Sequence, residues 1–428
     1  MHEEEDGAAV RAVKKRIFFL LIAVGASAAI FCAYKLADAL LGKVFEKTVP
    51  APASSAASSK TASARRSAVG LAGTSDGTGQ DASPVSETGI FSVSFPAARE
   101  KMKTMSLKEK VGQVFLFRCP VSGAVKAIDS YQPGGYCLMA DNFEGKTTAQ
   151  VQKMLKSYQN SSKVKMILAC DEEGGTVVRV SRFPALASKP FASPQDVYKS
   201  GGMDAVKADT VKKAELLRSL GLNMNLAPIA DVSTDPSDFI YARSFGKNAA
   251  DTSAFVAASV KTYESEKLSC ALKHFPGYGN NADTHTAPAR DKRSYQTFAE
   301  SDFLPFQAGI QAGAPCVLVS HNIVECIDPQ NPASLSQKVH EVLRKTLGFT
   351  GVVLTDDLSM KGVTEAAGGK NPAVAAFLVG NDMLLSSNME TDFNALYAAV
   401  QNGAIREQRL DESVLRILAW KYSEGILT

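Results

Sequence analysis

The 428-residue chain has little of what marks several specialised protein classes. Seven cysteines are too few for a small disulfide-stabilised scaffold, and no C-x-x-C or Cys/His spacing indicates a zinc site. A formal net charge of +3 lacks the basic excess of a dedicated nucleic-acid binder. No metal, nucleotide or flavin motif is present, so we expect no cofactor. What remains, 45% apolar and 21% charged residues, is typical of an ordinary folded protein.

One long apolar run occurs near the N-terminus. Ile17 to Tyr34 carries no charge and follows Lys14, Lys15 and Arg16. The run is long enough to span a bilayer as a helix, and the preceding basic residues orient it with its N-terminus inside. We therefore expect a cytoplasmic tail over residues 1–16 and a transmembrane signal-anchor helix over 17–36. Two alternatives are a signal peptide cleaved near Ala26–Ala28 and a lipid-modified Cys32. All three place the rest of the chain outside the cytoplasmic membrane, in the periplasm or extracellular space.

The next segment, residues 37–94, is dominated by Ala, Ser, Thr, Gly and Pro. Such a sequence cannot bury enough apolar surface to fold, and it predicts a disordered linker. Gly73–Gly77 matches the G-x-S-x-G pattern, but that motif requires a preceding strand and a following helix, and the linker predicts neither.

Residues 95–428 alternate short β-prone runs with longer helical stretches, without a second linker. This alternation of eight β–α units predicts an α/β fold, a single (β/α)8 TIM-like barrel. The expected strands are Val114–Phe117, Gly135–Met139, Lys165–Cys170, Asn223–Ala227, Cys270–His274, Cys316–Ser320, Gly351–Thr355 and Asp382–Ser386. Helices are expected at Thr148–Tyr158, Val206–Leu220, Ala254–Glu266, Gln337–Thr346 and Asp411–Tyr422.

Polar side chains follow five of the eight expected strands. An aspartate after a strand is often only the N-cap of the next helix. In an α/β barrel, however, the carboxyl ends of the strands converge on one face, where active sites are built. Five polar strand ends therefore predict one shared site on that face. They are Asp171, Asp231, Lys273-His274, Ser320-His321 and Asp356.

Three segments together resemble glycoside hydrolase family 3, in its β-N-acetylglucosaminidase (NagZ-like) branch. They are Asp171–Arg179 (DEEGGTVVR), Lys273–His285 (KHFPGYGNNADTH) and Gly348–Met360 (GFTGVVLTDDLSM). The K-H-F-P-G segment with a following D-x-H is the most specific. The resemblance covers about residues 98–427. It implies a retaining hydrolase that removes terminal non-reducing β-linked N-acetylglucosamine from cell-wall fragments, muropeptides or similar glycans.

The resemblance also assigns roles to matching positions. Asp356 matches the nucleophile, His285 the acid/base and Asp283 the partner of that histidine. The residues that match binders of the terminal sugar are Asp171, Arg179, Arg243, Lys273 and His274. The neighbouring Asp357 is a rival for the nucleophile, and we expect it to point away from the pocket or to cap the next helix. An imidazole can serve as acid and base because it titrates near neutral pH.

One departure from the family pattern concerns the loop that carries the acid/base pair. It is one residue shorter, and Tyr278 stands where the family has histidine. We expect the Gly277–Ala287 loop to close over the substrate. Other interpretations are a β-glucosidase or broad-specificity exo-glycosidase, a phosphorylase that uses phosphate in place of water, and a non-catalytic glycan-binding barrel held at the membrane. The sequence does not determine the natural glycan or the oligomeric state.

Overall fold

The computed structural model describes residues 88–281 and 289–428. The expected transmembrane helix (17–36), most of the expected linker, and the loop positions Asp283 and His285 lie outside the described residues. Within the described ranges, no helix combines the length and hydrophobicity needed to cross a membrane. Phe91, which falls in the segment expected to be linker, is buried in the core.

The centre of the structure is a nearly closed parallel barrel of eight strands, as the β–α alternation predicts. The order around the sheet is β10-β1-β2-β3-β4-β5-β7-β9, and a parallel bridge between Leu354 and Met383 links its two edges. The strands are β1 (Phe115–Arg118), β2 (Gly135–Cys137), β3 (Ile167–Cys170), β4 (Met224–Asn225), β5 (Ser269–Phe275), β7 (Cys316–Val319), β9 (Val352–Thr355) and β10 (Leu384–Ser386).

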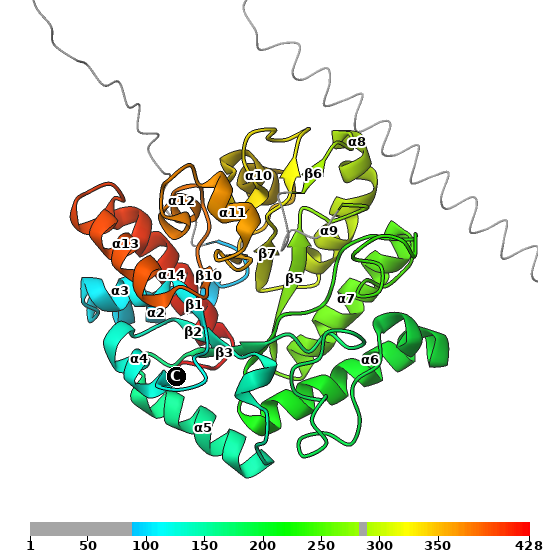
Figure 1. The fold of residues 1–428 in the computed structure, drawn as a ribbon, viewed down its shortest axis with the longest axis horizontal. Helices are drawn as coiled ribbons and strands as arrows, with labels where there is room; N and C mark the ends of the chain where they lie inside the picture. Colours follow the sequence, from blue (N-terminus) through cyan, green and yellow to red (C-terminus); the bar gives the residue numbers. More distant parts are fainter. Residues whose placement is uncertain (1–87, 282–288) are drawn as a thin grey trace, which may run out of the picture. The chain divides into compact units, whose positions relative to one another are not determined.

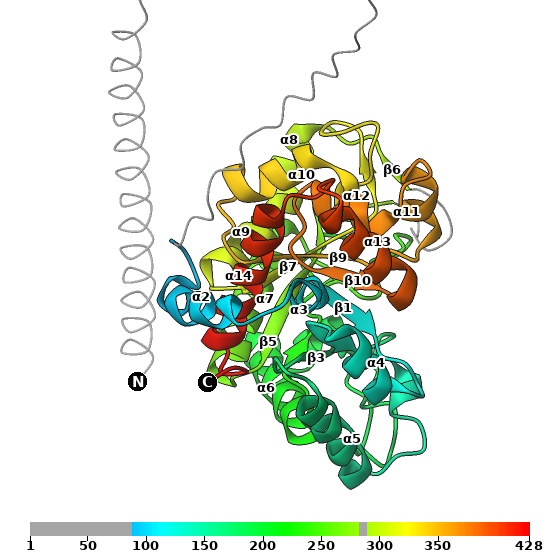
Figure 2. The same ribbon diagram turned by 90° about the vertical axis from the view of Figure 1, so that its left-hand side faces the viewer.

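Helices surround these strands, and each strand is followed by at least one of them (Figure 1). Those that follow the barrel strands are α4 (Ala124–Tyr131), α5 (Thr148–Ser161), α6 (Pro194–Leu220), α7 (Ala249–Ser265), α8 (Tyr295–Thr297), α9 (Phe303–Gln311), α10 (Gln337–Glu341), α11 (Lys361–Ala366), α12 (Pro372–Leu378) and α13 (Met389–Gln401). Before the first strand lie α2 (Phe95–Lys103) and α3 (Leu107–Gln113), and the last helix is α14 (Glu407–Ser423). Helix α14 packs against α2 (Figure 2).

Local sequence explains where these elements begin and end. Helix α5 starts after Thr147, whose hydroxyl caps the Gln150 N–H while the Gln150 side chain accepts from the Thr147 N–H. Helix α6 stops at Gly221, whose φ of +100° is readily adopted only by glycine. The strands are almost continuously apolar and buried, as expected of a parallel sheet covered by helices.

Two features differ from the sequence expectation. A second, two-stranded parallel sheet of β6 (Arg290–Asp291) and β8 (Ile323–Val324) lies outside the barrel. The helix expected over Gln337–Thr346 is α10 followed by a π-helical segment, η5 (Val342–Thr346). Strands of two residues carry no measurable periodicity, so sequence patterns do not reveal them.

A buried ionic cluster closes the opposite end of the barrel from the predicted site. Asp382 precedes β10, and its carboxylate accepts from the Val353 N–H at the start of β9 and from the Arg344 guanidinium at 2.6 Å. Arg416 of α14 also pairs with Asp382. This cluster connects the last helix to the amino-terminal ends of two strands, which is a structural role.

Candidate active site

The carboxyl ends of the barrel strands surround a pocket of about 470 Å³. Residues at the carboxyl ends of β3, β5 and β9 contribute most of its charged groups. Three of the five predicted polar strand ends, Asp171, Lys273-His274 and Asp356, line this pocket, whereas Asp231 and Ser320-His321 are buried and do not line it. All the sugar-binding and nucleophile positions that the sequence predicted, apart from the undescribed loop, line this one pocket. They are Asp171, Arg179, Arg243, Lys273, His274 and Asp356.

Four charged side chains form a continuous network along one wall. The Lys273 ammonium lies 2.6 Å from Asp171 Oδ1 and 2.7 Å from Glu173 Oε1. Arg243 donates to the Glu173 carboxylate from Nε at 2.9 Å and from Nη2 at 2.7 Å. Lys273 is only 2% exposed, so its charge depends on these two acids. The network holds two cations and two carboxylates at fixed positions in the pocket wall.

The pKa values in this network follow from the pairing. Burial raises the pKa of Glu173, but the Lys273 and Arg243 charges outweigh burial and hold this pKa far below its usual range. Burial likewise lowers the pKa of Lys273, and the Asp171 and Glu173 carboxylates more than reverse that effect. Glu173 and Lys273 therefore both stay charged at neutral pH.

His274 is oriented by a buried acid on its far side. Its Nδ1 lies 2.8 Å from Asp231 Oδ2, and the same oxygen accepts the His274 backbone N–H at 3.1 Å. With the proton on Nδ1, the ring presents Nε2 as an acceptor to Arg243 Nη2 at 3.2 Å. The Tyr278 ring packs edge-on against the imidazole, with centroids 5.1 Å apart. Asp231 thus fixes the tautomer and direction of a pocket residue.

Arg179 also lines the pocket. Its Nη2 lies 3.5 Å from Asp171 Oδ2, while its buried Nε has no hydrogen-bond partner among the described residues. The preceding loop is held by Glu172, whose carboxylate accepts the backbone N–H groups of Arg179 and Val180 at 2.8 and 2.7 Å. The Arg179 side chain lines the pocket and is 25% exposed, so its guanidinium can donate to a ligand oxygen, as expected for a sugar-binding arginine.

Asp356 directly follows β9 and lies in the pocket wall. Burial raises the pKa of its carboxyl, but the neighbouring His321, His274 and Lys273 side chains and the Asp357 N–H, which donates at 2.8 Å, bring the pKa below its ordinary value. The carboxylate is therefore ionised at neutral pH, which a nucleophile requires.

Asp357 also lines the pocket, contrary to the expectation that it would turn away or cap the following helix. Its Oδ1 accepts the backbone N–H of Ser359 at 2.9 Å and that of Ser387 at 3.2 Å, and its Oδ2 accepts the Ser387 hydroxyl. These bonds connect β9 to β10 and occupy both oxygens of Asp357. Among the described residues, the Asp356 carboxylate accepts a hydrogen bond only from the Asp357 N–H, so it is better suited to react.

The positions predicted as the acid/base pair, Asp283 and His285, lie outside the described residues. The chain is described up to Asn281, and again from Ala289, at the rim of the barrel.

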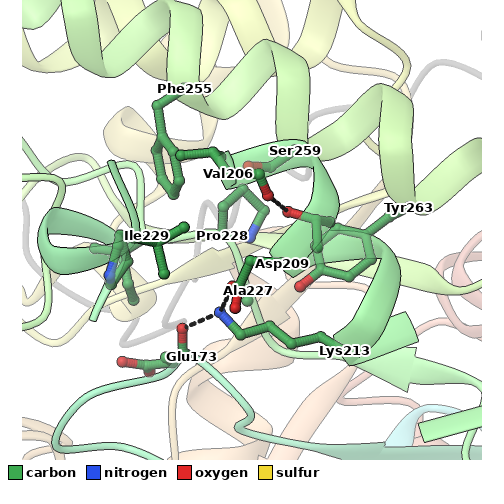
Figure 3. A pocket seen from close by; sticks show the side chains of 13 residues that line it. Glu173, Val206, Asp209, Lys213, Ala227, Pro228, Ile229, Phe255, Ser259 and Tyr263 are labelled. Carbon is green, nitrogen blue, oxygen red and sulfur yellow. Dashed lines mark hydrogen bonds and ion pairs between the residues drawn. The ribbon is translucent and has the colours of Figure 1, made fainter. Parts of the chain in front are cut away.

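A second and much smaller cavity, of about 20 Å³, lies behind Glu173, between that residue and helices α6 and α7. Figure 3 shows Lys213 reaching from α6 to Glu173, whose backbone carbonyl accepts from Nζ at 2.8 Å. Asp209 pairs with the same ammonium at 2.7 Å. The space holds about one water molecule. This cavity is too small for a sugar, and its charged residues support the backbone of Glu173.

Sequence reasoning gave no role to Glu173 or Asp231. Glu173 stands inside the D-E-E-G-G segment, but sequence alone does not show which of the adjacent glutamates faces the pocket. Asp231 was recognised as a polar strand end only. Among the residues described by the structure, no group of three His, Cys, Asp or Glu side chains is placed to hold a metal ion.

Comparison with known proteins found a matching family and several similar enzymes. The profile of the Glycosyl hydrolase family 3 N terminal domain matches residues 106–420. A beta-hexosaminidase of Idiomarina loihiensis is 31% identical over 260 residues, covering 59% of this chain and 76% of the relative. Beta-hexosaminidase A of Pseudoalteromonas piscicida is 29% identical over 325 residues, covering 69% of this chain, which spans only 54% of that relative's length.

Among solved structures, one similar fold is a glycoside hydrolase family 3 beta-N-acetylglucosaminidase from Paenibacillus sp. strain FPU-7. It superposes with a TM-score of 0.70 at 28% identity, covering 76% of this chain and 63% of that one.

Proposed function

The chain belongs to glycosyl hydrolase family 3, and we propose that it is a retaining exo-glycosidase that hydrolyses terminal non-reducing β-linked N-acetylglucosamine. The observation that carries this proposal is the ionised Asp356 in the same pocket as the Asp171–Lys273–Glu173–Arg243 network. The names of the relatives, beta-hexosaminidases and a beta-N-acetylglucosaminidase, support the choice of sugar.

The proposed reaction has two displacements. Asp356 attacks the anomeric carbon and forms a covalent glycosyl-enzyme, while the aglycone oxygen leaves with a proton from His285. The imidazole, oriented by Asp283, then takes a proton from water, which attacks the same carbon and releases the sugar with its original configuration. Two inversions give net retention, and Asp356 returns to its ionised form.

The pocket groups complement a sugar with several hydroxyls. Asp171 offers carboxylate oxygens as acceptors, while Lys273 and the partly exposed guanidinium of Arg179 offer donors. Arg243 and His274 extend this polar surface along one side. Hydrogen bonds to charged groups are stronger than neutral ones, so this set favours a hydroxyl-rich ring over an apolar ligand.

We further propose that the barrel acts outside the cytoplasmic membrane, held there by residues 17–36, on N-acetylglucosamine-containing wall fragments. The uncharged run with basic residues before it supports this placement. Protease treatment of intact and permeabilised cells tests it: digestion of the barrel only after permeabilisation of the inner membrane would contradict it.

Asp356→Asn tests the reaction. The amide cannot form the glycosyl ester, so release of nitrophenol from 4-nitrophenyl N-acetyl-β-glucosaminide should fall by about 10⁴-fold or more. Asp357→Asn is the matched control and should retain most of the activity, provided that thermal melting shows both variants folded. Unchanged turnover by the Asp356 variant would refute the assignment.

The acceptor and the sugar are tested with the same enzyme. In phosphate buffer the wild-type enzyme should release free N-acetylglucosamine. If sugar 1-phosphate were the main product, the enzyme would be a phosphorylase and the proposed hydrolysis would be wrong. The N-acetylglucosaminide should be turned over faster than the matching 4-nitrophenyl β-glucoside, and the reverse preference would contradict the proposed sugar.

A further inference from the structure

A second charged cluster lies beside the active-site pocket, at the base of the loop assigned to the acid/base pair. Its members are Asn281, Asp291, Arg293 and Asp302, which we call the Arg293 cluster. The guanidinium contacts the Asp302 carboxylate at 2.9 and 3.0 Å and the Asp291 carboxylate at 2.7 to 3.1 Å. Asp291 and Asp302 are each 1% exposed. Such bidentate pairs fix geometry as well as contributing energy.

The cluster holds the segment that enters the loop. The Asn281 amide donates to Asp291 Oδ2 at 2.7 Å. Gly277 and Gly279 adopt φ values of +125° and +51°, and a β-carbon on either would collide with Asp302 or Arg293 respectively. The backbone of this segment therefore lies directly against the cluster, in conformations that glycine adopts readily.

The same cluster holds the segment that leaves the loop. Asp291 belongs to β6, which pairs with β8, and the Ile323 N–H donates to the Ala289 carbonyl at 2.8 Å. The Asp291 carboxylate accepts the Arg293 backbone N–H at 2.9 Å. Asn281 is the last described residue before positions 282–288, and Asp291 lies shortly after them. The hydrogen bond between Asn281 and Asp291 therefore joins the two described segments that flank these positions.

From this geometry we infer that Arg293, with Asn281, Asp291 and Asp302, is a positioning element for the general acid/base rather than only a part of the fold. The inference rests on the proposed function, in which His285 lies between these two ends. A catalytic side chain must be held close to its productive geometry, and residues behind it supply that precision.

The composition of the cluster supports this interpretation over simple packing. One arginine faces two buried carboxylates, and burial of an unequal set of charges costs free energy that an apolar contact would not. The guanidinium also lies over the Phe298 ring, 4.4 Å from its centroid, which fixes its plane. The guanidinium of Arg293 is therefore fixed in position and direction by several contacts. Such precise orientation favours a role in positioning the loop over a role in stability alone.

The experiment measures how activity depends on the leaving group. Phenol needs a proton to depart, whereas 2,4-dinitrophenol does not, so loss of acid catalysis slows the phenyl glycoside selectively. The values of kcat/KM for phenyl and 2,4-dinitrophenyl N-acetyl-β-glucosaminide are compared in Asn281→Ala, Arg293→Lys, His285→Ala and wild type. The control is Arg344→Lys, which alters an arginine paired with buried Asp382 at the other end of the barrel.

We expect Asn281→Ala and Arg293→Lys to slow the phenyl glycoside by about 10- to 100-fold, with less than about a threefold change for the dinitrophenyl glycoside. Arg344→Lys should leave the ratio of the two substrates unchanged. Asn281→Ala removes only the hydrogen bond to Asp291. This variant therefore still tests the positioning role if Arg293→Lys does not fold.

Equal losses on both substrates, or none, would overturn the inference if His285→Ala still shows the selective loss, and the proposed function would stand. If His285→Ala shows no selectivity, the proposed acid role of His285 fails, and the positioning role fails with it.

Discussion

Replacement of Glu173 by glutamine tests whether the buried network positions the sugar-binding groups. The change keeps the shape of the side chain and removes its charge. Three contacts of 2.7 to 2.9 Å, two from Arg243 and one from Lys273, then lose their ionic character. A hydrogen bond to a charged group is worth roughly 1 kcal/mol more than a neutral one, so the three together amount to about 3 kcal/mol. If this energy is expressed in substrate binding and catalysis, it corresponds to a loss of about 10²-fold in kcat/KM.

The assay is kcat/KM for 4-nitrophenyl N-acetyl-β-glucosaminide, with urea denaturation of the same preparations. Asp382→Asn is the matched control, because it also neutralises a buried acid between two cations, but at the opposite end of the barrel. The control should lose stability and retain the kcat/KM of its folded fraction. A Glu173→Gln enzyme whose kcat/KM stays within about threefold of wild type would refute the positioning role of Glu173.

Two further predictions concern stability. Burial lowers the pKa of Lys421 to about 7, and its ammonium donates to Gln113 Oε1 at 2.7 Å. Because the unfolded ammonium titrates near 10.5, the folded protein should lose stability as pH falls from about 10 to 7, by up to about 1.4 kcal/mol per unit, with no further loss from this group below pH 7. Urea denaturation at pH 7 and 9.5 should show this component in wild type and not in Lys421→Met; equal pH dependence in both would contradict it. Asn322 is fully buried, and neither atom of its amide has a hydrogen-bond partner among the described residues. Asn322→Leu should therefore raise the free energy of unfolding by about 1–2 kcal/mol, and a decrease would show that the amide is satisfied in solution.

The barrel strands could be predicted because each is a short apolar run bounded by turn residues. Gly135–Cys137 and Val352–Thr355 fall inside their predicted ranges, since tertiary packing and local preference agree there. The π-helical end of α10 was not predicted, because helical periodicity does not distinguish α from π hydrogen bonding over five residues.

The site was predicted only in part, because the sequence does not distinguish the roles of acidic residues that are adjacent in the chain. Glu172 and Glu173 are chemically equivalent in the sequence, yet Glu172 binds the backbone N–H groups of a loop while Glu173 pairs with Lys273. Asp356 and Asp357 are likewise two adjacent aspartates, and only their hydrogen-bond partners in the folded structure distinguish their roles. The roles of such neighbours depend on which strand and loop lie opposite them, and this information is non-local.

Covalent trapping tests the central claim most directly. A 5-fluoro analogue of N-acetylglucosaminyl fluoride forms the glycosyl-enzyme and slows its hydrolysis, so that the label can be located by peptide mass spectrometry. We predict one sugar per chain, attached to Asp356 through an ester. A label on Asp357, or rapid turnover of the natural substrate with no covalent species detectable at any time, would contradict the account.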